Sequence, residues 1–359
     1  MLRLAYARRM ATVHILRGRD TLRITLSGPR LITGEGDSAI VQAFASEEAA
    51  RSHLEMVLAR RRRSGYTIET QELDEEPALP DPLVGVVEYD ATRRNMRVTF
   101  KGSEIPPGRC DQIVARAAEV KPLCLQILCD HASPGASLSS ALAGVRLPSI
   151  RSFIFDTYFQ TVTRQAENSP GDLAAVLEAM PALEAAFITG DVLLRPLVHA
   201  TLRALFLLAD PITPRSISGL GGSHLPALTT LGVMLCSDGG PVAGEPIAGA
   251  LLKLGAPKLA RIEVDGVEDI STFLSALTTR ALPASWSTLR VDGGIADEDA
   301  LLSVLTESKA KMAKLSVLAL PLADEVSQDA AEQGAKLLPS LKDCDDVPTS
   351  LLPDTYEKW

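Results

Sequence analysis

The sequence predicts an α/β fold in which a curved parallel sheet with outer helices forms a solenoid behind a small α+β domain. Two observations lead to this fold class: a short apolar frame, L-x-x-L-x-L, recurs through the C-terminal two-thirds of the chain, and the composition changes near residue 72. The first positions of the frames are 33, 19, 26, 31, 27 and 26 residues apart, a typical period for stacked repeat units. The seven clear frames are Ile150-Phe153-Phe155, Leu183-Ala186-Ile188, Leu202-Leu205-Leu207, Leu228-Leu231-Val233, Leu259-Ile262-Val264, Trp286-Leu289-Val291 and Met312-Leu315-Val317.

Each frame predicts a short β-strand with one buried face. Its fourth and sixth positions are apolar and alternate with Arg, Glu, Thr or Ser, which is the period of a half-buried strand. Helical runs such as residues 246–254 and 296–305 follow and would cover the buried face. Such a unit buries its apolar side only against its neighbours, so several must stack. Weaker frames at Val120-Leu123-Leu125 and Leu338-x-x-Leu341 bring the expected stack to eight or nine units.

Over residues 120–343 these frames resemble the leucine-rich repeat family, whose consensus continues L-x-x-L-x-L-x-x-N/C. The resemblance implies one parallel strand per repeat, on a single curved sheet with a concave binding surface. An ordinary α/β domain with chance spacing is the alternative, because short periodic patterns recur by accident. At the ninth position the copies hold Asp191, Asp210 and Cys236, which suit a turn, and elsewhere Val267, Gly294 and Leu320.

The N-terminal residues predict a small α+β domain. Residues 12–16 and 21–26 alternate apolar and polar side chains around Gly18-Arg19-Asp20, which indicates a β-hairpin. A third strand is expected at residues 40–44, and residues 66–68 resume a strand after a helix.

That helix is marked at both ends. Ser46 can cap it, Glu47 and Glu48 suit its positive end, and an arginine run lies at its negative end. The stretch Phe44-x-Ser46-Glu47-Glu48-Ala49-Ala50, followed by Gly65-Tyr66, resembles a WGR domain, a small module found in poly(ADP-ribose) polymerases and in many bacterial proteins. The family's Trp-Gly-Arg-x-Gly signature corresponds here to Arg30-Leu31-Ile32-Thr33-Gly34, in which only the final glycine remains. The family's nucleic-acid contacts are therefore not carried over.

The arginine run, Arg60, Arg61, Arg62 and Arg63, has two interpretations. Residues 1–71 contain twelve Arg, no Lys and seven acidic residues, a net charge of +5, so the rest of the chain carries −14 to give the total of −9. The run can contact phosphates through salt-dependent contacts. Alternatively it stabilises the helix end and stays solvated, because the module lacks exposed aromatic residues for base stacking and the protein as a whole is acidic.

The domain organisation follows from these patterns. A pair of strands joined by residues 90–94 would form a hairpin that caps the solenoid, and Met10 is a candidate for the natural start. The expected parts are a WGR-like domain at residues 10–71, an acidic, Pro-rich linker at 72–82, an N-terminal cap at 83–119, leucine-rich repeats at 120–343 and a C-terminal tail at 344–359.

Cysteine usage and hydropathy indicate a cytoplasmic protein. The chain has five cysteines, an odd number without the spacing of a disulfide framework, which fits a reducing compartment. No uninterrupted apolar stretch is long enough to predict a membrane span. The N-terminus has charges on both sides of a very short apolar stretch, so we expect no secretion signal there.

The polar residues do not form a catalytic pattern. Cys110, Cys124, Cys129 and His131 lack the pair spacing of a zinc site, and buried inert thiols are expected. The run Gly219-Leu220-Gly221-Gly222-Ser223-His224 lacks the G-K-[ST] ending of a phosphate loop and predicts a loop between repeats. We therefore expect no enzyme, no cofactor and no metal.

The variable positions of the frames predict a shared concave surface for a protein partner. Phe187 and Phe206 are expected side by side on neighbouring strands as an aromatic anchor, the alternative being a solvated face with two incidental aromatics. The first hypothesis is a cytoplasmic, bacterial, non-enzymatic scaffold or interaction protein. The second is a nucleic-acid-associated protein whose Arg-rich head contacts phosphates; neither involves a membrane. The candidate partner-binding residues are Arg151, Glu184, Phe187, Arg203, Phe206, Thr229, Arg261, Glu263, Arg290 and Lys314.

Overall fold

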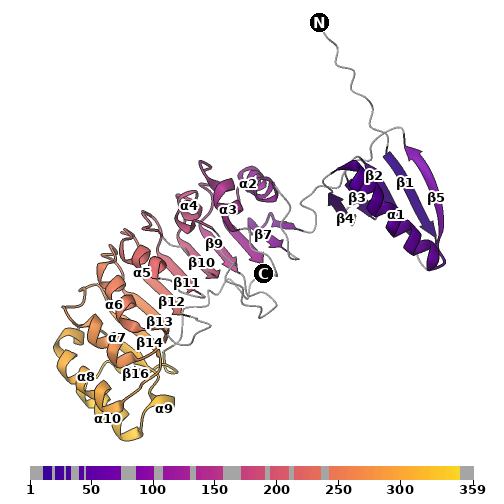
Figure 1. Ribbon diagram of the computed structural model, residues 1–359. Coiled ribbons are helices and arrows are strands. Elements are labelled where there is room, and N and C mark those ends of the chain that lie inside the picture. Colours follow the sequence, from indigo (N-terminus) through magenta and orange to yellow (C-terminus); the bar gives the residue numbers. More distant parts are fainter. Residues whose placement is uncertain are drawn as a thin grey trace. The chain divides into compact units, whose positions relative to one another are not determined.

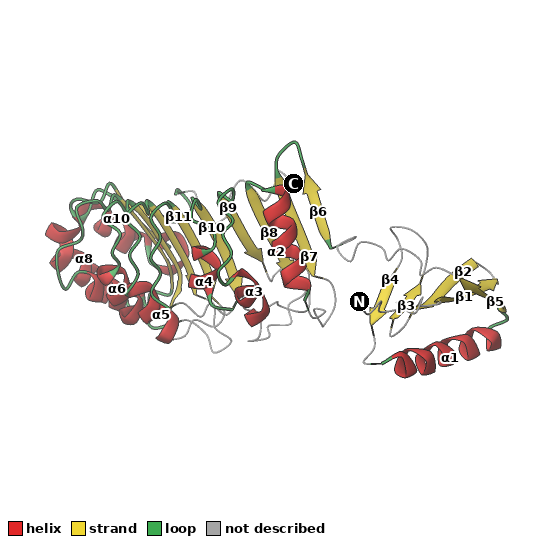
Figure 2. Cartoon of the chain, turned by 90° about the horizontal axis from the view of Figure 1, so that it is seen from above, coloured by secondary structure: helices red, strands yellow, loops and turns green. Residues whose placement is uncertain are grey.

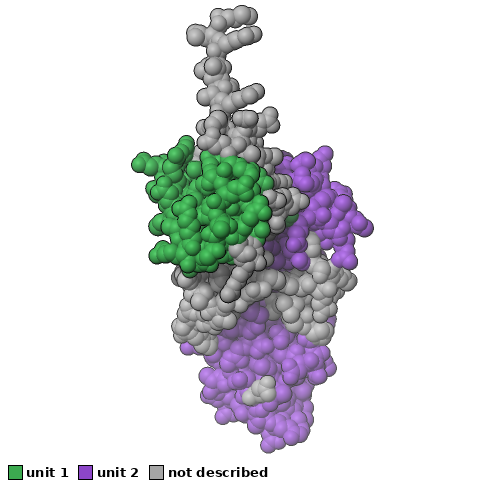
Figure 3. Space-filling view, turned by 90° about the vertical axis from the view of Figure 1, so that its right-hand side faces the viewer, with its two compact units in different colours: residues 1–87 green, residues 88–359 purple. Residues whose placement is uncertain are grey.

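The computed structural model contains two compact units, residues 1–87 and residues 88–359 (Figure 3). The structure describes residues 11–17, 21–27, 30–33, 40–43, 46–73, 86–100, 108–129, 135–156, 171–190, 195–209, 214–235 and 242–347. Several positions used in the sequence predictions lie outside these ranges: Met10, Gly18 to Asp20, Gly34, Phe44, residues 74–82 of the linker, His131, Asp191, Asp210, Cys236 and residues 348–359 of the tail.

The first unit is a five-stranded antiparallel sheet packed against one helix. The strand order is β4-β3-β2-β1-β5. Its core joins Leu16, Ile24 and Leu26 of the sheet to Leu54 and Leu58 of the helix. The elements are β1 (Ala11–Arg17), β2 (Thr21–Ser27), β3 (Arg30–Thr33), β4 (Ile40–Ala43), α1 (Glu47–Arg63) and β5 (Thr67–Leu73).

The predicted hairpin and helix of this unit are confirmed. Strands β1 and β2 pair antiparallel, with Thr12 opposite Leu26. The Ser46 hydroxyl caps α1 by accepting a hydrogen bond from the Ala49 amide at 3.1 Å. Strand β3 was not predicted: it occupies the stretch assigned to the degenerate signature. Strand β5 continues to Leu73, opposite Ala11, so it extends into the stretch predicted as linker.

The second unit is built on an 11-stranded sheet whose strands lie in chain order. The order is β16-β15-β14-β13-β12-β11-β10-β9-β8-β7-β6, and the pairs from β7 to β16 are parallel. The strands are β6 (Val87–Asp90), β7 (Asn95–Phe100), β8 (Cys124–Cys129), β9 (Ser152–Asp156), β10 (Ala185–Gly190), β11 (Ala204–Ala209), β12 (Thr230–Leu235), β13 (Arg261–Val267), β14 (Thr288–Gly293), β15 (Val317–Leu320) and β16 (Leu341–Asp343).

Helices between successive strands cover one face of this sheet (Figures 1 and 2). Parallel neighbours need a crossover connection, usually a helix. Between β10 and β11 the described residues 195–203 form no helix. The helices are α2 (Arg109–Val120), α3 (Gly135–Leu142), α4 (Leu173–Glu178), α5 (Pro214–Gly221), α6 (Gly244–Lys253), α7 (Ile270–Leu277), α8 (Glu298–Met312), α9 (Leu322–Glu325) and α10 (Gln328–Leu337).

The core between sheet and helices contains the frame residues. In the middle of the sheet, Leu205, Leu231 and Ile262 lie side by side in register, and all three are fully buried. These residues hold the fourth position of their frames. The frame recurs because the side chain at this position packs against the adjacent units in the core. In six of the seven clear frames, those from Ile150 to Trp286, a strand begins two residues after the first frame position.

Two predicted frames have the wrong register. Met312 is the last residue of α8, and Leu318 rather than Leu315 pairs with Leu289, so the seventh frame is Leu315-Leu318-Leu320. A frame that begins at Met312 and one that begins at Leu315 both satisfy the pattern. Because α8 extends to Met312, the strand follows the second of them. The weaker frame at Val120 is also displaced, since Leu123 is exposed while Leu125 pairs with Phe153.

The glycine run predicted as a loop lies at the end of a helix instead. Helix α5 extends through Gly219 to Gly221. A Cβ at Gly221 would lie 3.1 Å from the Cα of Ala250 in α6, so glycine allows the two helices to approach closely. The run therefore has a packing role between neighbouring units.

Candidate functional site

The candidate site is the face of the 11-stranded sheet that points away from the helices, called here the second face. Because strand side chains alternate, the fifth frame positions lie on this face while the fourth and sixth lie in the core. The strand register aligns the fifth positions across eight strands into a single row, the central row. The central row consists of Gln126, Ile154, Phe187, Phe206, Gly232, Glu263, Arg290 and Ala319.

Three neighbouring positions of the central row, Ile154, Phe187 and Phe206, are apolar. Phe187 pairs directly with Phe206 on the next strand and with Ile154 on the previous one. These three side chains and Cys124 form an apolar cluster, against which Ala204 and Met234 pack. Phe187 and Phe206 thus lie side by side as predicted, and the aromatic pair belongs to a larger apolar cluster whose members are buried.

Glu263 and Arg290 of the central row belong to a group of charged side chains on β13 and β14. The Arg261 Nε donates to Glu263 Oε1 at 2.6 Å, and Arg290 Nη2 donates to Asp292 Oδ2 at 3.0 Å. Arg261, Glu263, Arg290 and Asp292, with Asp265 beside them, form the charged cluster. Burial raises the pKa of Asp265, and the nearby Asp292 acts in the same direction, while Arg290 opposes both. Gly232 separates the charged cluster from Phe206 without adding a side chain.

The ten predicted partner-binding residues fall into three groups. Phe187, Phe206, Arg261, Glu263 and Arg290 lie in β-strands and point to the second face. Four others lie immediately before their strands and follow one another along the edge where the strands begin: Arg151, Glu184, Arg203 and Thr229, called here the edge row.

Within the edge row, Arg151 Nη1 lies 3.7 Å from Glu184 Oε1, with both side chains largely exposed. Lys314 is the exception among the predicted residues. It lies in the turn after α8, because the seventh frame begins at Leu315 and not at Met312, so it is not on the shared surface. The sequence prediction of one surface is thus wrong for Lys314.

The arginine run lies in the last turn of α1 as predicted. The Arg61 guanidinium lies 5.2 Å from the centroid of the Tyr66 ring, and Arg63 Nε donates to the Ala59 carbonyl at 3.4 Å. Burial lowers the pKa of His14, and the charge of Arg62 acts in the same direction. Arg60, Arg62 and Arg63 remain exposed.

The candidate nucleophiles have structural environments. Burial raises the pKa of Cys110 and of Cys124 to about 11, which keeps both thiols protonated at neutral pH. The Ser223 hydroxyl donates to the Gly219 carbonyl at 2.8 Å and accepts from the Leu197 amide at 2.9 Å, so it joins neighbouring units. Within the described part of the chain, no group of three or more His, Cys, Asp or Glu side chains is arranged to hold a metal ion.

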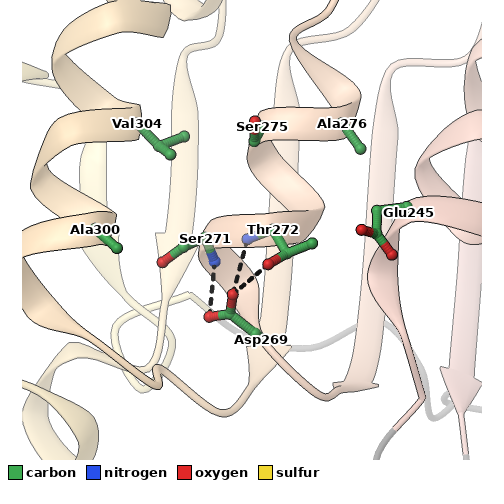
Figure 4. Close-up of a pocket in the computed structure, with 8 residues that line it drawn as sticks. All are labelled: Glu245, Asp269, Ser271, Thr272, Ser275, Ala276, Ala300 and Val304. Carbon is green, nitrogen blue, oxygen red and sulfur yellow. Dashed lines mark hydrogen bonds between the residues drawn. The ribbon is translucent and has the colours of Figure 1, made fainter.

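A surface cavity of about 410 Å³ lies between α6, α7 and α8 on the helix side (Figure 4). Its carboxylate at Asp269 accepts from the Ser271 and Thr272 amides and from the Thr272 hydroxyl, which caps α7. The lining residues are Glu245, Asp269, Ser271, Thr272, Ser275, Ala276, Ala300 and Val304. The Asp269 carboxylate is already used by the hydrogen bonds that cap α7. We therefore take the second face, and not this cavity, as the candidate site.

Sequence reasoning missed part of the second face. Ile154 belongs to its apolar cluster, Met234 packs against that cluster and Asp292 belongs to the charged cluster, yet they were not among the predicted residues. Ile154 holds the fifth position of the first clear frame, so taking that position from every frame would have found it. Asp292 follows the last frame residue of its strand, where the pattern no longer applies.

Comparisons with known proteins identify the fold alone. No family model matches the sequence, and no curated protein matches it. The crystal structure of a Bacteroides fragilis protein, determined by a structural genomics consortium, is similar with a TM-score of 0.52 and 15% sequence identity. The match covers 94% of this chain and 97% of that chain. It supports a mixed α/β fold with a long, mostly parallel sheet. Among the described residues, no helix combines the length and the apolar character needed to cross a membrane.

Proposed function

We propose that this chain is a non-enzymatic interaction protein that binds a protein partner through the second face of a leucine-rich-repeat-type solenoid. The observation that carries the proposal is the pairing of Phe187 with Phe206 next to Ile154, which places contiguous aromatic and aliphatic side chains on the face without helices among the described elements. Aromatic and arginine side chains are the residues that most often dominate binding energy in protein interfaces. Extended sheets of stacked units commonly bind partners in this way.

The charged cluster supports a partner with both apolar and polar groups. Arg290 Nε is buried and has no hydrogen-bond acceptor within the described part of the chain. A partner carbonyl or carboxylate at this point would satisfy the donor and fix the register of binding, because leaving a buried donor unpaired is costly. The apolar cluster would then provide affinity and the charged cluster specificity.

The proposal also covers the class of the first unit and the cellular location of the protein. We regard the first unit as a degenerate WGR-like head and the protein as cytoplasmic and bacterial. The four cysteines of the described residues, Cys110, Cys124, Cys129 and Cys344, are free and buried, which is compatible with a reducing compartment.

Affinity capture with the full chain as bait tests the proposal. Phe206→Ala should weaken capture of the partner by about 2 kcal/mol, roughly thirtyfold in affinity. The matched control is Val198→Ala, which shortens an apolar side chain that is 63% exposed and lies before the strand β11. Equal losses for the two variants, or no loss for Phe206→Ala, would contradict the proposed role of the second face.

A second candidate function is nucleic-acid association through the head. The observation that favours it is the exposure of Arg60, Arg62 and Arg63 at one end of α1. The positions of Arg61 over Tyr66 and of Arg63 against the helix backbone favour the alternative, in which the run stabilises its own unit. Protein binding therefore remains the first proposal.

A further inference from the structure

The cavity between α6, α7 and α8 contains a buried hydroxyl group without a hydrogen-bond partner. Ser271 is 5% exposed and lines the cavity, and its Oγ makes no hydrogen bond among the described residues. Figure 4 shows this hydroxyl turned away from the Asp269 carboxylate and toward the α8 side of the cavity, where Ala300 lies. A buried hydroxyl without a partner costs free energy, so a ligand that pairs with it gains a hydrogen bond that the protein alone does not make.

The lining of the cavity is negatively charged. Its eight residues include two acids, Glu245 and Asp269, and no Lys, Arg or His, a net charge of −2. Asp269 lies beside the free hydroxyl, because its Oδ1 accepts from the Ser271 amide at 3.2 Å. Glu245 is exposed in the first turn of α6 and makes no ion pair within the described part of the chain.

The surrounding helix ends have the same sign of charge. Helix α8 begins with Glu298 and Asp299, and residues 262–279 and 291–308 contain no Lys or Arg. Acidic residues suit the positive ends of helices, so this charge alone does not define a site. Together with the unpaired Ser271 hydroxyl, it favours a cationic ligand that donates hydrogen bonds.

The shape and lining of the cavity suit an organic cation. Among the described residues, no group of three or more His, Cys, Asp or Glu side chains could hold a metal ion. A volume of about 410 Å³ lies within the range of small-molecule sites. Ala276, Ala300 and Val304 add apolar side chains against which a hydrocarbon chain can pack.

The two acids lie on different sides of α7. Figure 4 shows Glu245 on the α6 side, whereas the Ser271 hydroxyl points to the α8 side, with Ser275 and Ala276 one turn further along the helix. Two cationic groups joined by a hydrocarbon chain would match both the separation of these polar groups and the net charge of −2.

We propose that this cavity binds a small aliphatic diamine. One ammonium group donates a hydrogen bond to Ser271 Oγ beside Asp269, the other pairs with Glu245, and the hydrocarbon chain between them lies across α7. The site is on the helix side of the second unit, so it goes beyond the proposed function and does not depend on a partner at the second face.

Methyl NMR of the full chain tests the proposal, with Ala276, Ala300 and Val304 as reporters in the cavity. Titration with 1,5-diaminopentane at constant ionic strength should give saturable shifts of these methyl groups. The monoamine n-pentylamine should bind about tenfold more weakly, because it lacks the second charge-assisted hydrogen bond. The uncharged 1-pentanol should give no saturable shift.

Two variants separate the polar contacts. Ser271→Ala should weaken binding of 1,5-diaminopentane about tenfold without lowering the melting temperature, since the protein loses no internal hydrogen bond. Glu245→Gln should reduce the affinity for the diamine to that of n-pentylamine. The matched control is Glu268→Gln, which removes the same charge from an exposed residue that does not line the cavity and should leave the affinity within about twofold.

Val304→Phe should block the cavity, so that the methyl groups of Ala276 and Ala300 no longer respond to the diamine. Absence of saturable shifts in the wild type, or equal affinities for the diamine and the monoamine, would overturn the proposal. A loss for Glu268→Gln as large as that for Glu245→Gln would also overturn it, because the acidic helix ends would then attract cations without a specific site.

Discussion

Arg261 and Glu263 form an ion pair on the second face in which the carboxylate is fully buried and the guanidinium is not. The two residues are separated by one position in β13, so both side chains point to the same side of the sheet, and Arg261 Nε lies 2.6 Å from Glu263 Oε1. A buried carboxylate is stable only when it is paired and hydrogen-bonded. The guanidinium of Arg261 thus stabilises a buried carboxylate on the second face.

Arg261→Ala should destabilise the protein by about 3 kcal/mol, because Glu263 would remain buried without its guanidinium partner. The double variant Arg261→Ala with Glu263→Ala should recover part of this loss, since no buried charge remains. Urea denaturation followed by circular dichroism measures both. A single variant as stable as the wild type would show that the ion pair does not support Glu263.

Asp269 should make the stability of the second unit depend on acid pH. Burial acts to raise its pKa, but hydrogen bonds from Thr272 and Ser271 outweigh burial and lower it. A lowered folded-state pKa stabilises the fold above the unfolded value of about 3.9, and this contribution disappears as the pH falls through the folded-state pKa. Asp269→Ala should therefore cost about 1 kcal/mol at neutral pH and progressively less in acid.

The control for this experiment is Asp269→Asn, which keeps a capping oxygen but removes the titrating group. Its stability should be close to that of the wild type at low pH, and the difference should grow as the pH rises. Thermal melts between pH 3 and pH 7, a range chosen around the ordinary carboxyl pKa of about 3.9, would show the trend. A constant difference across this range would contradict the assigned role of the carboxylate.

Replacing Arg60, Arg61, Arg62 and Arg63 with Gln tests the choice between protein and nucleic acid. If the run stabilises α1, the full chain should bind duplex DNA or RNA no more tightly than the micromolar, non-specific range at physiological salt. The Gln variant should then capture the protein partner as well as the wild type does. Capture that is lost in this variant and is sensitive to nuclease would favour the second candidate function.

Residues 83–359 should fold without the first unit. The compact units divide at residues 87 and 88, and the 11-stranded sheet has its own core between strands and helices. The fragment should be monodisperse and melt cooperatively, as scanning calorimetry would show. Aggregation of the fragment, under conditions in which the full chain remains folded, would mean that the first unit is required for folding.

The frame made most of the large sheet predictable because each apolar position corresponds to a buried site between adjacent units. The same reasoning predicted the Phe187 and Phe206 pair, since one strand per frame places their fifth positions side by side. It failed at the seventh frame, because both Met312, the last residue of α8, and Leu315, which precedes β15, can serve as the first position of the pattern.

The burial of Glu263 was also unpredictable from alternation, which assigns a charged side chain on this face to solvent. Strand β3 was missed because its four residues carry no strong period of their own. Both features depend on contacts between residues far apart in the sequence, which a local sequence pattern does not show.

Photo-crosslinking from Met234 tests most directly whether the second face binds a protein. Met234 packs against the apolar cluster and is half-buried, so a photoreactive amino acid at this position lies beside Phe206 without replacing it. We expect irradiation in native lysate to give one dominant protein adduct, which is reduced by Phe206→Ala and absent when the photoreactive residue is placed at Val198 instead. Adducts of equal yield from Val198, or none from Met234 while affinity capture succeeds, would place the binding surface elsewhere.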